Sequence, residues 1–329
     1  MNIKVSCHII TYNQRAYISK CIDGMLMQKT NFLFEIIVGD DNSSDGTREI
    51  LIEYQNKYPE IIRLNFRDKR GDGIPGKDNF MSTYSLCVGK YIALCEGDDY
   101  WTDQLKLQKQ VDFLEANPDY VLSCHKVAIL DGELFKEDNI NTLHDNYEQM
   151  ETLAKHGNYI HTPSVVFRNI IQPLPEEFND SPLGDFFLYM LLAQHGKLNR
   201  QDDVMAVYRF SSGVWSGQSS YSRNFKTTLT HTLLYKYFNS IGNAEIATIL
   251  LSRIQSFIRN FISQISPEDL NRIVQLSANK NNVLELRFAQ SIISKILIET
   301  EPERTIERIG IKQLIKHLTL KIRKKLVRS

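Results

Sequence analysis

Hydrophobic and polar residues follow two alternating patterns over the first 130 residues of the chain. Short apolar runs rich in Val, Ile and aromatic residues predict strands, and apolar residues at every third or fourth position between them predict helices. The resulting β-α-β-α-β-α-β-α-β succession with short connections is typical of an α/β fold, in which a mostly parallel central sheet carries helices on both faces. The predicted strands cover residues 3–10, 34–39, 61–66, 91–95 and 120–130; the predicted helices cover 18–27, 50–58, 78–88 (capped by Gly89) and 107–117.

Three of the predicted strands end in polar segments that a buried strand does not need. The segments are residues 11–14 (Thr-Tyr-Asn-Gln), 40–45 (Asp-Asp-Asn-Ser-Ser-Asp) and 96–99 (Glu-Gly-Asp-Asp). Ligands of open α/β sheets bind beyond the carboxyl ends of the strands, so we expect the three segments to line one crevice. Capping of the next helix explains the serines of the second segment, but it does not explain the adjacent aspartates at 40 and 41.

The three carboxylates within residues 96–99 carry the strongest chemical signal. Like charges at the end of a buried strand repel one another and are costly to desolvate. A hard divalent cation such as Mg²⁺ or Mn²⁺ would resolve this conflict, because such ions prefer carboxylate oxygens. The alternative is a solvated acidic turn, in which Gly97 serves only to let the backbone turn.

The pattern loosens after residue 131. We expect a loop at 131–146, a short helix at 150–155, an extended segment at 159–167 and a strand at 204–210, followed by a loop that contains Trp215. Asp185 precedes the apolar run 186–193 and is expected at or near a helix N-terminus, where capping is the ordinary role of Asp.

From about residue 222 the pattern is helical, with breaks near Gly242, Pro267 and Pro302. We therefore predict two parts, a domain at 1–220 and a helical region at 221–329. The last helix combines an apolar face with Lys and Arg residues between 312 and 328, which makes it a candidate for lying on an anionic membrane surface. The alternative is that its apolar face docks on this protein or on a second copy, which would make a homodimer.

Composition narrows the class of protein. Of 329 residues, 42% are hydrophobic and 24% are charged, as in ordinary soluble globular proteins, and the net charge of zero gives no reason to expect a nucleic-acid partner. The five cysteines lie within the first 124 residues without a CxxC pair, which favours buried reduced thiols in a cytoplasmic protein over disulfides or a zinc site. We find no signal-peptide core and no run near the roughly 20 apolar residues of a membrane span.

Four stretches together resemble the motifs of family 2 glycosyltransferases with the GT-A fold. They are residues 9–14 (Ile-Ile-Thr-Tyr-Asn-Gln), 35–47 (Glu-Ile-Ile-Val-Gly-Asp-Asp-Asn-Ser-Ser-Asp-Gly-Thr), 89–93 (Gly-Lys-Tyr-Ile-Ala) and 96–101 (Glu-Gly-Asp-Asp-Tyr-Trp). Their order and spacing agree with the family over about residues 1–130, and less closely over 131–217. The resemblance implies a Rossmann-like nucleotide-sugar-binding half at 1–130 and an acceptor-binding half at 131–220.

The resemblance also implies a nucleotide-sugar donor, with a UDP-sugar as the favoured class. In the family, residues matching Thr11, Tyr12 and Asn13 form the floor of the nucleotide pocket. The residue matching Asp41, with Asp40 beside it, contacts the base.

Glu96-Gly97-Asp98 stands at the place of the family's Asp-x-Asp motif. Asp98 is then expected to bind a Mg²⁺ or Mn²⁺ ion that bridges the diphosphate, with Asp99 as a second metal ligand. Glu96 departs from the commoner Asp, and its longer carboxylate would reach the ribose or the metal.

A positioned carboxylate must take the proton of the acceptor hydroxyl as it attacks. Asp185 suits this role, because the family places its base in an acidic motif at a helix start at about this distance along the chain. The usual Glu-Asp pair of that motif is Gly184-Asp185 here, and Asp180 and Glu177 are the alternative bases.

Two further parts of the resemblance are less specific. Asn79 resembles an Asn that borders the donor site; the Arg that commonly precedes it is replaced by Asp78, with Lys77 as a candidate substitute. Arg209 and Trp215 resemble the segment that closes over the diphosphate and the acceptor. Trp faces stack well on sugar rings, and the alternative for Trp215 is packing between the catalytic domain and the helical tail.

We therefore predict a cytoplasmic, metal-dependent, inverting hexosyl- or N-acetylhexosaminyl-transferase, peripheral on the inner face of the membrane. Its acceptor would be a glycan or lipid-linked hydroxyl in surface polysaccharide synthesis. A nucleotidyltransferase shares the layout and the metal, but it needs a glycine-rich basic loop directly after the first strand, and a dehydrogenase needs GxGxxG there. A non-catalytic nucleotide-sugar-binding or scaffold protein is the third alternative, and the joint presence of Asp41, Asp98 and Asp185 argues against it.

Overall fold

The computed structural model of the chain describes residues 2–71, 73–138, 143–210 and 220–264, and the structural statements below concern these residues. The elements in chain order are β1 (Val5–Thr11), α1 (Ile18–Leu26), β2 (Phe34–Asp40), α2 (Thr47–Lys57), β3 (Ile62–Phe66), α3 (Lys77–Tyr84), β4 (Tyr91–Glu96), β5 (Tyr100–Trp101), α4 (Lys106–Ala116), β6 (Tyr120–Asp131), β7 (Leu134–Lys136), α5 (Met150–His156), the 3₁₀ turn η1 (Thr162–Ser164), β8 (Val166–Arg168), α6 (Glu176–Asn179), α7 (Gly184–Ala193), β9 (Lys197–Arg209), α8 (Ser220–Ser240) and α9 (Ala244–Gln264).

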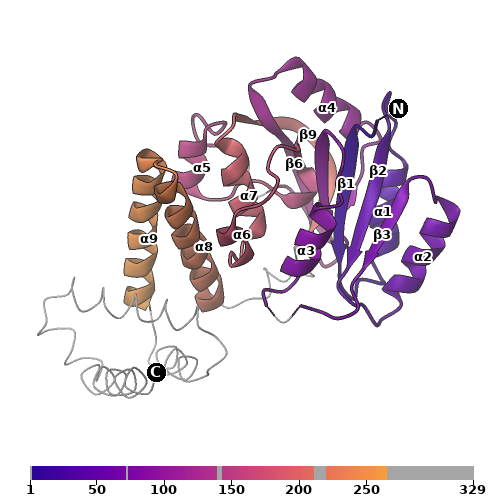
Figure 1. The fold of residues 1–329 in the computed structure, drawn as a ribbon, viewed down its shortest axis with the longest axis horizontal. Helices are drawn as coiled ribbons and strands as arrows, with labels where there is room; N and C mark the ends of the chain where they lie inside the picture. Colours follow the sequence, from indigo (N-terminus) through magenta and orange to yellow (C-terminus); the bar gives the residue numbers. More distant parts are fainter. Residues whose placement is uncertain (1, 72, 139–142, 211–219, 265–329) are drawn as a thin grey trace, which may run out of the picture. The chain divides into compact units, whose positions relative to one another are not determined.

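The strands form one sheet in the order β3-β2-β1-β4-β8-β6-β9-β5, with β7 added beside β6. Strands β1, β2, β3, β6 and β9 are labelled in Figure 1. The ladders that join β3, β2, β1 and β4 are parallel. Strand β8 is antiparallel to both of its neighbours, β4 and β6, and β9 is parallel to β6. Strands β6 and β9 therefore point in the same direction as β1–β4, and the predicted mostly parallel α/β sheet is confirmed, with β5, β7 and β8 as reversed strands.

Helices cover both faces of the sheet, as the pattern predicts. On one face, Val5, Cys7 and Ile9 of β1 pack with apolar residues of α1, α2 and α4. On the other face, Ile92 and Leu94 of β4 belong to a second cluster, which includes residues of α3, α5 and α7. A strand buried on both faces is expected to be apolar throughout, as β4 is up to Cys95, whereas β1 includes the buried polar residues Ser6 and His8.

The predicted helix over 78–88 is wrong at its C-terminal end. Helix α3 ends at Tyr84, and Gly89 lies beside β1, where its N–H donates to the Ser6 hydroxyl at 2.9 Å. A Cβ atom on Gly89 would lie 2.6 Å from the backbone nitrogen of Ser6. Close approach of two backbone segments, and not a helix cap, requires this glycine.

Three boundaries in the second half also differ from the prediction. The loop expected at 131–146 contains strand β7, which forms a hairpin with β6. The segment expected to be extended at 159–167 is a strand only from Val166 onward. Strand β9 begins at Lys197, seven positions before the predicted start at 204. Its ladder with β6 has register shifts, which interrupt the alternation of apolar and polar residues along the strand.

The chain divides into two compact units, Met1–Arg253 and Ile254–Ser329. Within the first unit, Leu233 and Leu234 of α8 pack in the same apolar cluster as α7, so this helix shares the core of the sheet domain. The turn between α8 and α9 contains Gly242, at the predicted break, with a φ of 79°. The division at residue 220 stays a prediction, and the basic end at 311–329 with the breaks at Pro267 and Pro302 lies outside the described residues.

The cysteines and the helix lengths bear on two further predictions. All five cysteines are buried and free, as expected. Within the described part of the chain, each helix is too short or too polar to cross a membrane.

Candidate active site

The carboxyl ends of β1, β2 and β4 meet at one edge of the sheet. The register pairs Thr11 with Asp40, and the N–H of Asp41 donates to the carbonyl of Thr11 at 3.0 Å. On the other side of β1, the N–H of Gly97 donates to the carbonyl of Ile10 at 3.0 Å. The three polar segments that the sequence singled out therefore lie next to one another.

Hydrogen bonds tie the segment after β1 to the segment after β2. Asn13 has a φ of 51°, a left-handed conformation that Asn tolerates better than most residues. Its N–H donates to the Ser43 hydroxyl at 2.8 Å, and its Oδ1 accepts from the N–H of Ser44 at 2.9 Å. The N–H of Arg15 donates to the Asp45 carboxylate at 3.0 Å. These contacts fix the backbone on which the predicted floor of the nucleotide site rests.

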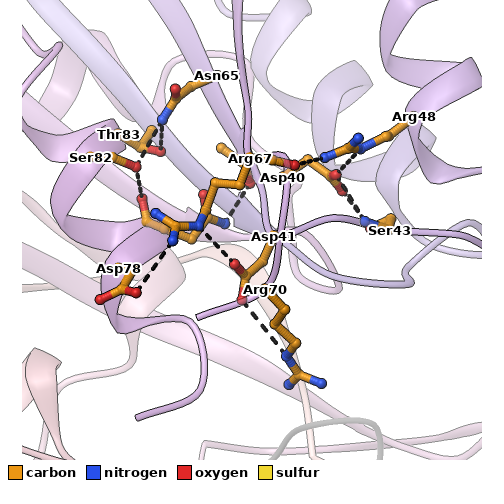
Figure 2. Close-up of polar contacts among 12 residues, drawn as sticks. Asp40, Asp41, Ser43, Arg48, Asn65, Arg67, Arg70, Asp78, Ser82 and Thr83 are labelled. Carbon is orange, nitrogen blue, oxygen red and sulfur yellow. Dashed lines mark hydrogen bonds and ion pairs between the residues drawn. The ribbon is translucent and has the colours of Figure 1, made fainter. Parts of the chain in front are cut away.

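Asp41 lies between two arginines beside this floor (Figure 2). The buried carboxylate has Oδ1 at 3.1 Å from Arg67 Nε and Oδ2 at 3.8 Å from Arg70 Nε. The geometry of the Arg67 contact is poor for a hydrogen bond, and Oδ1 makes none with any described residue. The Arg70 guanidinium lies 3.9 Å from the centroid of the exposed Tyr12 ring. An acceptor oxygen, an aromatic face and two planar cations suit a planar base that donates hydrogen bonds.

Asp40 has different contacts, although it is the next residue in the chain. Its fully buried carboxylate pairs with Arg48 and accepts hydrogen bonds from the hydroxyl and, at 3.0 Å, the N–H of Ser43 (Figure 2). Both oxygens are thus engaged inside the protein, where they hold the turn between β2 and α2. The predicted contact of Asp40 with the base stays a prediction.

Glu96, Asp98 and Asp99 form an acidic cluster in which one carboxylate oxygen of each lies within 4.8 Å of the others. Burial, and next the charge of Asp98, raise the pKa of Glu96 to about 8 and the pKa of Asp99 well above its usual range. Asp99 Oδ1 accepts from the N–H of Arg209 at 2.7 Å, whereas its buried Oδ2 has no hydrogen-bond partner among the described residues. Desolvated carboxylate oxygens with few proton donors are the ligands that hard divalent cations require, so this cluster fits Mg²⁺ or Mn²⁺.

A tight turn presents the cluster to the segment after β1. The N–H of Asp99 donates to the carbonyl of Glu96 at 3.0 Å. Gly97, between them, packs so closely that a Cβ atom there would lie 2.4 Å from Gln14 Oε1 and 2.9 Å from Thr11 Oγ1. The Thr11 hydroxyl itself donates to Gln14 Oε1 at 2.7 Å. Glycine at 97 therefore sets the distance between the acidic cluster and the predicted floor of the nucleotide site.

Helix α7 brings Asp185 toward the cluster from the second half of the chain. As predicted, Asp185 lies in the first turn of the helix, and its Oδ2 accepts from Asn158 Nδ2 at 2.8 Å. Its charge contributes to the raised pKa of Glu96, so the two carboxylates interact electrostatically. Burial also raises the pKa of Asp185, against the opposing effects of the Phe186 N–H and the charge of Lys77. A carboxylate with a raised pKa near the acidic cluster is suited to the role of general base.

The two alternative bases have less suitable surroundings. Glu177 is engaged in an ion pair with Lys236, with 3.0 Å between Oε1 and Nζ. Asp180 is exposed at the end of α6. A solvated or ion-paired carboxylate is a weaker base than one held in a desolvated site.

Sequence reasoning missed Tyr208 of β9, which interacts electrostatically with the same carboxylates. Burial raises its pKa, and the charges of residues 96, 99, 185 and 98 raise it further. Its ring lies 5.0 Å from the ring of His161. Alternation along a strand places Tyr208 and Arg209 on opposite faces, but the face that meets the acids depends on how β9 pairs with β5 and β6.

The remaining predicted residues have distinct places. The Arg209 guanidinium lies over the rings of Tyr17 and Tyr100, at 4.6 and 5.4 Å, and its Nε has no hydrogen-bond partner among the described residues. Asn79 is buried, and its Nδ2 donates to the carbonyl of Gly39 at 2.8 Å, which supports the end of β2 from α3. Its role at the donor stays a prediction. Trp215 lies outside the described residues.

Comparison with known proteins identifies the family. The model of the family described as Glycosyl transferase family 2 matches residues 6–173, just over half of the 329 residues. The chain therefore belongs to this family, and the predicted relationship is confirmed.

Two curated relatives are similar over part of their length. An uncharacterized protein of Mycobacterium tuberculosis is 36% identical over 225 residues, which cover 68% of this chain and 63% of that relative. The "Putative teichuronic acid biosynthesis glycosyltransferase TuaG" of Bacillus subtilis is 32% identical over 115 residues, which cover 34% of this chain and 43% of that protein. The chain thus spans less than two thirds of the length of the relatives that it matches.

A solved structure shows the same fold. TarS 1–349 of S. aureus, in complex with UDP, has a TM-score of 0.59 and 17% identity, and the alignment covers 88% of each chain. The predicted GT-A type α/β fold is confirmed by this likeness, which at such low identity concerns the fold alone.

Proposed function

We propose that this protein is a metal-dependent, inverting glycosyltransferase that moves a sugar from a nucleotide sugar to an acceptor hydroxyl. One observation carries the proposal. The acidic cluster at 96–99, the proposed base-binding site at Asp41 and the half-buried carboxylate Asp185 lie toward the carboxyl edge of the sheet, although they come from three different segments of the chain. Family membership and the fold shared with a UDP complex support a UDP-sugar as the donor.

At the donor, Asp41 accepts a hydrogen bond from the nucleotide base, and the Tyr12 ring and the Arg70 guanidinium stack on that base. Asp98 and Asp99 hold the divalent cation, and Glu96 completes its surroundings or binds the ribose. The cation supplies positive charge that stabilises the leaving diphosphate.

At the acceptor, Asp185 takes the proton of the attacking hydroxyl. The acceptor oxygen forms a bond to the anomeric carbon as the bond from that carbon to the phosphate oxygen breaks, so one displacement inverts the anomeric centre. Because the pKa of Asp185 is raised by burial, its carboxylate is a stronger base than a solvated one.

We further propose a glycan or lipid-linked acceptor in surface polysaccharide synthesis. The likeness to TuaG, whose printed name refers to teichuronic acid, supports this class of product. Residues 1–220 would then carry the reaction. The basic segment at 311–329 would hold the protein on the cytoplasmic face of the membrane, through Lys and Arg side chains attracted to anionic lipid. Deletion of 311–329 should shift the protein from vesicles with anionic lipid to solution; loss of a dimer without that shift would assign the segment to subunit contact.

The first test is binding of a panel of UDP- and GDP-sugars, measured by thermal stabilisation with Mn²⁺ or Mg²⁺ and again with EDTA. A donor at 100 times its Kd stabilises the protein by about 2.7 kcal/mol. We expect stabilisation by one donor class with metal, its loss with EDTA, and its loss in Asp98→Asn with metal present. If no donor stabilises the protein and none is hydrolysed, the transferase proposal is wrong, and a scaffold role takes its place.

The second test separates binding from chemistry. Asp185→Asn should keep the metal-dependent thermal shift with donor and lose transfer by about 100-fold or more, because it removes the general base. Glu176→Gln, the same loss of charge at an exposed acid of α6, is the control and should leave transfer unchanged. Equal rates for wild type and Asp185→Asn would exclude Asp185 as the base.

A further inference from the structure

Lys77, the first residue of α3, has an unusual environment for a lysine. Lys77 is buried, with only 8% of its surface exposed, and its Nζ has no hydrogen-bond partner among the described residues. The ammonium lies 3.9 Å from the centroid of the Phe178 ring. A buried cation without a hydrogen-bond acceptor is costly, since the desolvation of its charge is offset only by the aromatic face and by nearby acids. A function is a more economical explanation than stability for such a residue.

The ammonium occupies the space beside residue 184. A Cβ atom on Gly184 would lie 3.0 Å from Lys77 Nζ, closer than such contacts usually are. A Cβ atom at 184 would therefore require the Lys77 ammonium to shift by a few tenths of an ångström. The motif that this chain resembles has an acid at 184, whereas in this chain the Lys77 ammonium lies beside the glycine at that position.

The charges of two acids raise the pKa of Lys77, and the charge of Lys77 lowers the pKa of one of these acids. Burial lowers the pKa of Lys77 to about 8, against the charges of Asp185 and Asp180, which raise it. In the opposite direction, the charge of Lys77 lowers the pKa of Asp185, which burial raises. The ammonium thus favours the ionised form of Asp185, whose other neighbours include the acidic residue Glu96.

We propose that Lys77 is a positioning residue for Asp185, and that its ammonium keeps the carboxylate negative and in place at the start of α7 while the carboxylate takes the proton of the acceptor. This inference rests on the proposed function, in which Asp185 is the base. Lys77 does not bind the donor in this account, because its side chain extends to Phe178 and Gly184, whereas the adjacent Asp78 pairs with Arg67 beside Asp41.

The test begins with Lys77→Met, which keeps the apolar stem and removes the charge. We expect kcat to fall by roughly tenfold or more, since the base is then less often ionised, while the KM for donor and the metal-dependent thermal shift with donor stay within about twofold. The melting temperature of the unliganded variant is measured alongside, so that a loss of folded protein is distinguished from a loss of kcat. Lys77→Arg, which keeps the charge, should retain more of kcat than Lys77→Met.

A kinetic double-mutant cycle then separates action through Asp185 from a general structural effect. If Lys77 acts through Asp185, adding Lys77→Met to the Asp185→Asn variant should reduce the transfer rate by less than about twofold in single-turnover assays. The carboxylate that Lys77 positions is already absent from that variant. In a control cycle with Glu176→Gln, at an exposed acid of α6, Lys77→Met should keep its full effect. If the fold-losses in transfer rate of Lys77→Met and Asp185→Asn multiply in the double variant, the inference is overturned.

Two other outcomes are equally decisive. A large increase in the KM for donor with unchanged kcat would assign Lys77 to an anionic group of the donor and overturn its role at Asp185. Normal transfer by Lys77→Met would overturn this inference alone, whereas absence of donor binding and transfer in the wild type would overturn the proposed function and this inference with it.

Discussion

At the scale of single residues, Asp40 and Asp41 show how neighbours with the same chemistry take different roles. Both are buried at the end of β2. Alternation along the strand sends their side chains to opposite sides. Asp40 is fully engaged by Arg48 and Ser43, while Asp41 lies between two arginines with one oxygen that makes no hydrogen bond among the described residues. We therefore expect Asp40 to stabilise the fold and Asp41 to bind the donor.

The matched variants Asp40→Asn and Asp41→Asn test this difference. Asp40→Asn should lower the free energy of unfolding by about 2–3 kcal/mol, because it breaks a buried ion pair. Asp41→Asn should cost less than Asp40→Asn, because Asp41 Oδ1 makes no hydrogen bond with Arg67 and Arg67 stays paired with Asp78. Donor affinity should fall about 10-fold to 100-fold in Asp41→Asn, the worth of one charge-assisted hydrogen bond.

Urea unfolding and donor titration measure the two effects. The expected pattern is a change in stability with intact donor affinity for Asp40→Asn, and the reverse for Asp41→Asn. Equal loss of donor affinity in both variants would instead favour the original prediction that both aspartates contact the base.

At the scale of elements, the turn after β4 and the segment after β1 form one unit. The Gly97 backbone lies against Thr11 and Gln14, with room for hydrogen only. The turn carries the acidic cluster, and the segment after β1 carries Tyr12 and Asn13. Close packing at one glycine thus couples the metal-type site to the nucleotide site.

Gly97→Ala should separate these two parts. The added methyl group must displace Gln14 or the turn, so we expect a loss of about 1–3 kcal/mol in stability and weaker binding of Mn²⁺. Gly73→Ala is the control, because a Cβ atom on Gly73 meets nothing within 4 Å. Calorimetric unfolding and Mn²⁺ titration check both variants. Mn²⁺ affinity equal to that of the wild type would show that the turn tolerates the shift.

At the scale of the whole molecule, two buried histidines connect the core to acid stability. His8 of β1 lies 4.8 Å from the Phe80 ring, and His231 of α8 lies 5.1 Å from the Phe186 ring. Burial lowers the pKa of each to about 4. Both imidazoles are therefore neutral in the folded protein at pH values where an unfolded chain binds protons.

This difference predicts the direction of the pH dependence. Between the unfolded pKa near 6.5 and the folded pKa near 4, the unfolded chain takes up protons that the folded chain does not, so stability falls as pH falls. Each histidine should contribute a loss of about 2–3 kcal/mol between pH 7 and pH 4.5. Urea unfolding at the two pH values measures the loss.

The double variant His8→Gln, His231→Gln should lose less stability over this range than the wild type does. His195→Gln, at an exposed position, is the control and should follow the wild type. Identical losses in all three proteins would show that other groups dominate acid unfolding.

The local features of the fold were predictable from the sequence. Apolar periodicity located β1, β2, β4 and α7, because burial on a sheet or helix face imposes the period directly on the sequence. The polar ends of the parallel strands indicated one shared edge, since parallel strands present their carboxyl ends together. The departures arose at Gly89 and at β7 and β8, where the constraint is contact with a distant segment.

What only the tertiary structure decided depends on residues far apart in the chain. Asp99 receives the N–H of Arg209, 110 positions away, and Tyr208 meets the acids because β9 pairs between β6 and β5. The separate roles of Asp40 and Asp41, and the contact of Lys77 with residue 184, likewise follow from packing between elements. The sequence by itself determined the family, the strand order along the chain and the acidic residues, because these are local patterns. Burial and contacts between distant residues determine the ionisation state and the partners of each acid, and no local sequence pattern encodes them.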